Sequence, residues 1–121
     1  MRFLIVSFVL ISLISCENKF AQDILGTWQC IDVSEEGNSL DLDVSVINFS
    51  FDENRGYTYQ GTLAYKEAGS YRLVGDKLYT TDTVDVNAVE KVVKITLLEG
   101  DSMKFKMNDG GKERIMSLVR K

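Results

Sequence analysis

The sequence of 121 residues has no histidine and no proline, and it has only two cysteines. Histidine is the commonest general base of enzymes and the commonest protein ligand of transition metals, so its absence argues against most catalytic and metal centres. The serines do not occur in the Gly-x-Ser-x-Gly motif of hydrolases. Asp52-x-Asn54 looks like the start of a calcium loop, but the twelfth position of such a loop would be Leu63 instead of glutamate. We therefore expect no enzymatic activity, no metal and no cofactor.

Basic residues are also scattered rather than clustered. The chain carries 14 Lys and Arg against 18 Asp and Glu, a formal net charge of −4, and it has no block of basic residues. Nucleic acids and anionic lipid surfaces attract proteins through such blocks. The composition therefore predicts no nucleic-acid partner, and attachment to a membrane would have to come from another source.

The chain has one long apolar segment, which begins after Arg2 and ends at Cys16. At about fifteen residues it is shorter than the roughly 20 that a membrane-spanning helix needs, but it has the length of the apolar part of a signal peptide. Its last residues, Leu13-Ile14-Ser15-Cys16, resemble the lipobox of bacterial lipoproteins. Two alternatives remain open, namely an ordinary secretory signal with an incidental cysteine, and a short buried segment.

The lipobox resemblance implies a location and an anchor. In bacterial lipoproteins the signal peptide is cut before the cysteine, and the thiol receives a diacylglycerol with acyl chains such as palmitate. Residues 1–15 would then be the signal peptide, Cys16 the lipidated N-terminus, and residues 16–23 a short tether. The acyl chains would anchor the protein to a bacterial membrane of the cell envelope, and we favour the outer membrane over the inner one.

Lipidation of Cys16 would leave Cys30 without a partner for a disulfide bond. Such a cysteine is either buried or reactive. Cys30 lies in an apolar run two residues after Trp28, and no basic residue beside it in the sequence would activate its thiol. We predict that Cys30 is buried.

Residues 24–121 have the pattern of a single all-β domain. Short runs rich in β-branched and aromatic residues alternate with turn residues such as Gly75-Asp76, and no apolar stripe has the helical period. A meander of strands removes its exposed edges by closing on itself. We therefore predict an eight-stranded antiparallel up-and-down meander barrel. The eight predicted strands cover residues 26–33, 42–51, 57–62, 70–74, 77–81, 89–98, 103–107 and 113–120.

The second predicted strand contains an irregularity. Its apolar positions change parity between Val46 and Ile47, which indicates a β-bulge or a bend at that point.

The first strand begins with Gly26-Thr27-Trp28, and together with the meander this motif resembles the lipocalins, most closely the small bacterial lipocalin-like lipoproteins. A Gly-Asp-Lys-Leu hairpin (75–78) and a final Leu-x-Arg-Lys (118–121) also recur in that family. The resemblance implies that Trp28 closes one end of the barrel and that Arg120 packs over its ring, beside Gly26. A guanidinium over an indole face stabilises by about 0.5–2 kcal/mol at distances within about 6 Å. The alternative is a lone buried tryptophan with an exposed arginine.

The resemblance also implies a small apolar or amphipathic ligand, and two groups of residues are candidates for binding it. Tyrosine combines apolar area with a hydrogen-bonding tip, and methionine lines adaptable apolar pockets. The candidates are Tyr57, Tyr59, Tyr71 and Tyr79 in the middle of the chain, and Met103, Phe105 and Met107 on one face of a late strand. The tyrosines also suit any half-buried strand, and Met103, Phe105 and Met107 also suit a packed core. The second hypothesis is therefore a filled barrel that acts as an interaction module, inhibitor-like, for a protein or a glycan.

Overall fold

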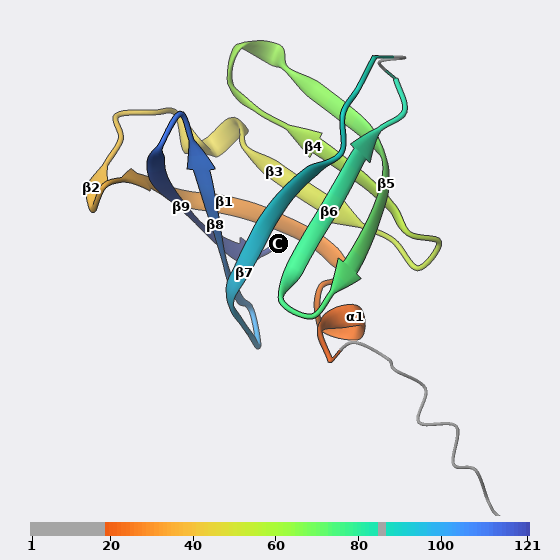
Figure 1. Cartoon of the computed structure of the whole chain (residues 1–121). Helices are drawn as coiled ribbons and strands as arrows, with labels where there is room; N and C mark the ends of the chain where they lie inside the picture. Colours follow the sequence, from red (N-terminus) through yellow and green to blue (C-terminus); the bar gives the residue numbers. More distant parts are fainter. Residues whose placement is uncertain (1–18, 85–86) are drawn as a thin grey trace, which may run out of the picture.

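The computed structural model describes residues 19–84 and 87–121. The predicted signal peptide and Cys16 lie outside these residues. Within them the chain forms one α-helix, two short 3₁₀ helices and nine strands (Figure 1). The elements are α1 (Phe20–Asp23), β1 (Gly26–Glu35), β2 (Asn38–Ser39), η1 (Val44–Val46), β3 (Asn48–Phe51), β4 (Gly56–Gln60), η2 (Thr62–Ala64), β5 (Lys66–Val74), β6 (Lys77–Asp82), β7 (Lys91–Glu99), β8 (Ser102–Asp109) and β9 (Lys112–Arg120).

Eight of the nine strands in the described residues close into an antiparallel barrel. Neighbouring strands pair in the order β1-β3-β4-β5-β6-β7-β8-β9, and β1 also pairs with β9 along most of its length. The remaining strand, β2, is a two-residue extension of the hairpin that follows β1. The eight barrel strands correspond to the eight predicted runs, so the predicted all-β up-and-down barrel is confirmed.

Of the two alternatives predicted between Val46 and Ile47, the structure shows a bend and no β-bulge. These residues lie at the end of the 3₁₀ helix η1, and β3 begins only at Asn48, so the parity changes because the strand has not yet started. The side-chain amide of Gln29 donates hydrogen bonds to the carbonyl oxygens of Val44 and Ile47, which fixes this turn against β1. The bulges of the barrel lie elsewhere, between residues 30 and 32 of β1 and between residues 95 and 97 of β7.

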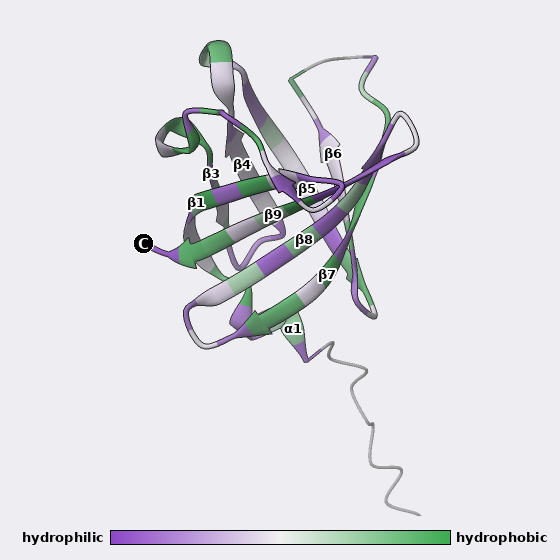
Figure 2. Ribbon diagram, turned by 90° about the vertical axis from the view of Figure 1, so that its left-hand side faces the viewer, coloured by the Kyte–Doolittle hydropathy of each residue, from purple (hydrophilic) through white to green (hydrophobic). Residues whose placement is uncertain are grey.

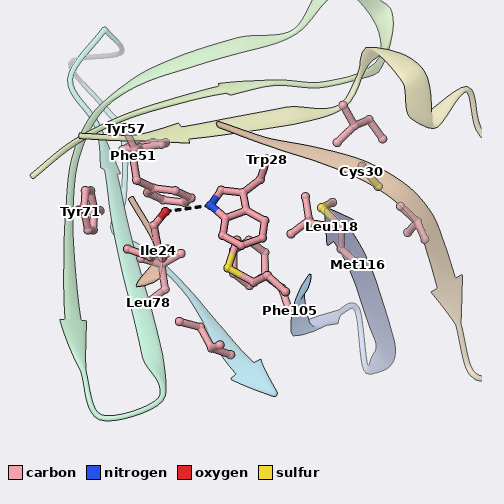
Figure 3. Close-up of a cluster of buried hydrophobic side chains, with 14 residues drawn as sticks. Ile24, Trp28, Cys30, Phe51, Tyr57, Tyr71, Leu78, Phe105, Met116 and Leu118 are labelled. Atoms are coloured by element: carbon pink, nitrogen blue, oxygen red, sulfur yellow. Dashed lines mark hydrogen bonds between the residues drawn. The ribbon is translucent and has the colours of Figure 1, made fainter. Parts of the chain in front are cut away.

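Side chains alternate between the barrel interior and solvent, as the period of two in a strand requires. The alternation is clear along β8, where hydrophobic and hydrophilic residues take turns (Figure 2). The inward side chains form one core, whose largest fully buried members include Trp28, Phe105, Leu78 and Met103 (Figure 3). This core ties the first strand to the late strands that pair with it.

The antiparallel meander gives the barrel two distinct ends. At one end, which we call the base, lie α1, the hairpin turns at 52–55, 75–76 and 100–101, and the C-terminus (Figure 1). At the other, which we call the far end, lie the segments 36–47, 61–65, 83–84 and 87–90 and the turn at 110–111. None of the helices in the described ranges has the length and apolar character that a membrane span requires.

The folded domain begins earlier than the sequence indicates. Residues 20–23, which were assigned to the tether, form α1, and Phe20 packs against the core. Phe20 is the one aromatic residue of that segment, and burying it holds the helix on the base.

Candidate functional site

Trp28 closes the base of the barrel. Its side chain is fully buried, and the indole Nε1 donates a 2.8 Å hydrogen bond to the carbonyl oxygen of Ile24 (Figure 3). The Cζ atom of Arg120 lies 4.4 Å from the centroid of the Trp28 ring, within the distance predicted for a cation–π contact. The same guanidinium donates to the backbone oxygens of Asp23 and Leu25. Arg120, at the end of the last strand, thus holds the segment that leads into the first strand and closes the base.

Gly26 makes this arrangement sterically feasible. Its φ of +115° is unfavourable for residues with a side chain, and a Cβ atom there would lie 3.1 Å from Nη1 of Arg120. The glycine and the tryptophan of the Gly-x-Trp motif therefore serve one purpose, which is to bring the arginine over the indole.

The structure places several predicted ligand-binding residues in the packed core. Met103 and Phe105 are almost completely buried, and the ring of Phe105 meets that of Phe49 edge-on at 5.4 Å. Tyr71 is also buried, and its hydroxyl donates a 3.0 Å hydrogen bond to the backbone oxygen of Asp52. These three side chains are packed against other parts of the protein, so they belong to the filled part of the interior.

Tyr79 lies on the outer wall, not in the interior as the sequence analysis proposed. Its neighbour Leu78 is buried in the core, so the alternation of β6 turns Tyr79 outward. The guanidinium carbon of Arg72 lies 4.0 Å from the centroid of its ring. The clustering of tyrosines in the sequence gave no information on which face each tyrosine occupies.

Several apolar side chains that pack against the core are only partly buried. Phe49, Tyr59 and Met107 lie towards the far end, whereas Leu73 and Leu98 lie near the base. The rings of Phe49 and Tyr59 are 4.6 Å apart. Of the predicted ligand-binding residues, Tyr59 and Met107 thus lie where a molecule entering the barrel would meet them.

Glu67 is a buried, hydrogen-bonded carboxylate that the sequence analysis missed. It is only 7% exposed, and it lies on β5 at the same inward parity as Tyr71. Its carboxylate accepts hydrogen bonds from the hydroxyls of Tyr57 (2.7 Å) and Tyr65 (2.6 Å) and pairs with Nζ of Lys91 at 2.6 Å. The strand predicted from the sequence began only at residue 70, so no strand parity was assigned to Glu67. We call Glu67, Tyr57, Tyr65 and Lys91 the polar cluster.

The polar cluster holds its groups in fixed protonation states. Burial raises the pKa of the Glu67 carboxyl, but the hydrogen bonds from Lys91, Tyr65 and Tyr57 outweigh it and leave the pKa below its ordinary value. Burial raises the pKa of the Tyr57 hydroxyl, and the adjacent carboxylate raises it further. At neutral pH the carboxylate is therefore ionised and the hydroxyl is a donor.

Glu67 should make the free energy of unfolding depend on pH in the acid range. Its folded-state pKa is below the ordinary value of 4.5, so its contribution is present at neutral pH and is lost as the pH falls through the folded pKa. We expect Glu67→Gln to lower the free energy of unfolding by about 1–3 kcal/mol at neutral pH, since hydrogen bonds to a charged group are weakened. The gap between wild type and variant should narrow below about pH 4.5 in urea unfolding curves.

The matched control is Glu99→Gln, which removes a carboxylate from an exposed position at the end of β7. Its curve should follow that of the wild type at both pH values. A gap for Glu67→Gln that stays constant from neutral to acid pH would contradict the assignment.

Exposed apolar residues gather at the far end. Of the large hydrophobic side chains that are exposed in residues 19–84 and 87–121, six lie in its connecting segments. Leu63 is fully exposed, and both it and Ala64 have a positive φ. We call these six residues the apolar rim: Leu42, Val46, Leu63, Tyr65, Val84 and Val89.

Cys30 is the one cysteine in the part of the chain that the structure describes. Cys30 is buried, as predicted, and burial raises the pKa of its thiol. The thiol also donates a hydrogen bond to the backbone oxygen of Asp32. A thiol in this state is a weak nucleophile. In the described part of the chain, no three acidic or cysteine side chains group together as a metal site would require.

Comparison with known proteins agrees with this geometry. A family model described as a lipocalin-like domain matches residues 24–112, most of the chain. No curated protein gives a significant match. The family is a binding fold with a closed antiparallel barrel, and the matched segment runs from the base of β1 into β9.

Proposed function

Because the chain belongs to the lipocalin-like family, we propose that it is an envelope lipoprotein whose barrel binds or carries a small apolar or amphipathic molecule. The observation that carries the proposal is a base closed by side-chain contacts beneath an apolar interior. Trp28 and Arg120 seal the base, whereas inward apolar side chains such as Phe49 and Met107 stay partly exposed at the far end. A site of this kind takes a ligand from one direction. We propose no catalytic activity for it.

The proposed anchor gives the barrel an orientation. Cys16 lies three residues before Lys19, so their Cα atoms are at most about 11 Å apart. Lys19 adjoins α1 at the base. A diacylglycerol on Cys16 would hold the base near the membrane, which we take to be the outer membrane, and would leave the far end facing away from it. The ligand would then enter from the aqueous side.

Native mass spectrometry of the full chain, extracted with detergent from the membranes of its own cells, tests both parts of the proposal. We expect a mass that lacks residues 1–15 and carries acyl chains, together with a bound small molecule that collisional activation releases. The control is Cys16→Ser, which should lack the acyl mass. An unacylated wild-type protein would refute the anchor, and a protein that neither retains nor takes up any amphiphile would refute the carrier.

The apolar rim favours a second function, an interaction module for a protein or glycan partner. Leu63 is fully exposed, and its positive φ is unfavourable for a leucine. An exposed leucine side chain also contributes little to the stability of the fold. A rim that contacts a partner would explain both features. In that case Leu63→Ser should abolish capture of the partner and leave the retained small molecule unchanged.

A further inference from the structure

Glu67 and Lys91 form an ion pair with unequal burial. The side chain of Glu67 is 5% exposed and that of Lys91 is 59% exposed, although Nζ lies only 2.6 Å from the carboxylate. The lysine thus reaches in from a solvated position on β7, where it can rotate away. Glu67 on β5 cannot leave the interior without breaking its bonds to Tyr57 and Tyr65.

The surroundings of the carboxylate suit a cation in other ways. Nζ of Lys91 lies 5.8 Å from the centroid of the Tyr65 ring, and the rings of Tyr65 and Tyr59 are 6.0 Å apart. Aromatic faces attract cations at this range. The polar cluster therefore combines a buried carboxylate with aromatic rings, and a cation of the chain itself already occupies it.

The charges around the polar cluster exclude an anionic ligand group. Glu67 and Lys91 cancel each other, and Asp82 on the adjacent strand β6 adds a negative charge near enough to act on Tyr57. Arg72 and Glu90 pair with each other on the exposed outer wall. A ligand carboxylate would have to approach Glu67, whereas an ammonium group would be attracted.

We propose that the polar cluster is the headgroup site of the barrel, and that it binds the ammonium group of an amphipathic primary amine in place of Nζ of Lys91. A primary ammonium has the same donors as lysine, so it can make the same hydrogen bond to Glu67. The lysine swings out into solvent when the ligand enters. This inference rests on the proposed function, since it names the chemistry of the ligand.

The apolar tail of the amine has a surface to cover. Glu67 lies opposite Tyr59 in the pairing of β4 with β5, and the Tyr59 ring contacts Phe49. From the polar cluster, partly exposed inward side chains therefore lead on to β4, which lies beside β5, and then to β3, which lies beside β4 (Figure 1). The site thus pairs one charged group with an apolar wall, as an amphipathic amine does.

Titration calorimetry of the full chain with decylamine, decanoate and decanol, each below its micellar concentration, tests the site. The three probes share a tail and differ only in the headgroup. We expect decylamine to bind best, and Glu67→Gln to weaken it about ten-fold or more because a charge-assisted hydrogen bond is lost. We expect Lys91→Met to strengthen decylamine binding about five-fold, because a tethered competitor acts at an effective concentration on the order of millimolar.

Two control variants match these changes on the outer wall. Glu90→Gln removes an exposed carboxylate, and Lys94→Met removes an exposed lysine from β7. Neither should alter binding of any probe. Misfolding cannot produce the tighter decylamine binding that we expect for Lys91→Met. This variant therefore still decides the test if Glu67→Gln folds poorly.

The outcomes separate this site from the function on which it rests. Equal binding of the three probes, or binding of decanoate that depends on Lys91, overturns the ammonium site and leaves the carrier function standing. Failure of all three probes to bind overturns both. Lysophosphatidylethanolamine distinguishes the two sources of the amine. Binding tighter than that of decylamine points to a lipid headgroup, and weaker binding points to a free amine.

Discussion

Replacing Trp28 with alanine lowers the free energy of unfolding by about 3–5 kcal/mol, the usual cost of removing a large buried aromatic side chain. Trp28 is fully buried and is the central residue of the base. Its loss leaves a cavity, leaves the Ile24 carbonyl without its indole donor, and deprives Arg120 of the ring over which it packs. Domains of this size have a total stability of only about 5–15 kcal/mol, so the variant should be near its folding threshold.

Urea unfolding followed by far-ultraviolet circular dichroism measures this loss, since the only tryptophan of the chain is removed. Trp28→Phe should lose less than Trp28→Ala, because it retains an aromatic ring. Leu63→Ala serves as the surface control and should change stability by less than about 0.5 kcal/mol. A Trp28→Ala protein with wild-type stability would show that the base does not depend on the indole.

Replacing Gly69 with alanine is expected to cost about 3 kcal/mol, at the upper end of overpacking effects. A Cβ atom at this position would lie 2.0 Å from the backbone oxygen of Thr81 and 2.9 Å from the backbone nitrogen of Thr83. Backbone atoms cannot rotate away as a side chain can, so β5 and β6 would have to separate. That movement would break the hydrogen bond from the Thr83 nitrogen to the Ala68 oxygen.

The matched control for this prediction is Ser70→Ala. It introduces the same residue one position further along β5, where the side chain is exposed. Thermal unfolding of the two variants should give a lower midpoint for Gly69→Ala, while Ser70→Ala stays close to the wild type. Equal midpoints would mean that the two strands separate at little cost.

The strand pattern was predictable because each strand contains its own signal. Met103, Phe105 and Met107 alternate with lysines, and Gly75-Asp76 provides the positive φ of a tight turn, so both the elements and their order could be inferred locally. The choice between a bulge and a bend near residue 46 stayed open for a related reason. A parity change records that the chain turns, but a bulge and a 3₁₀ turn produce the same change.

The polar cluster could not be predicted in this way. Glu67 has only charged and small residues beside it in the sequence, and its partners Tyr57 and Lys91 lie on other strands. An acidic residue in a strand is usually solvated. Burial of this one depends on donors such as Tyr57 and Lys91, which reach it only after strands β4 to β7 have paired.

By itself the sequence determined that the chain forms eight antiparallel strands in a meander and that Cys30 is buried, because period, turn residues and local apolarity are properties of short segments. Only the tertiary structure decided which tyrosines face inward, which end of the barrel is sealed, and which carboxylate lies inside it. Closure sets these features, since it fixes the register between strands distant in sequence and thereby brings Arg120 over Trp28 and Lys91 onto Glu67.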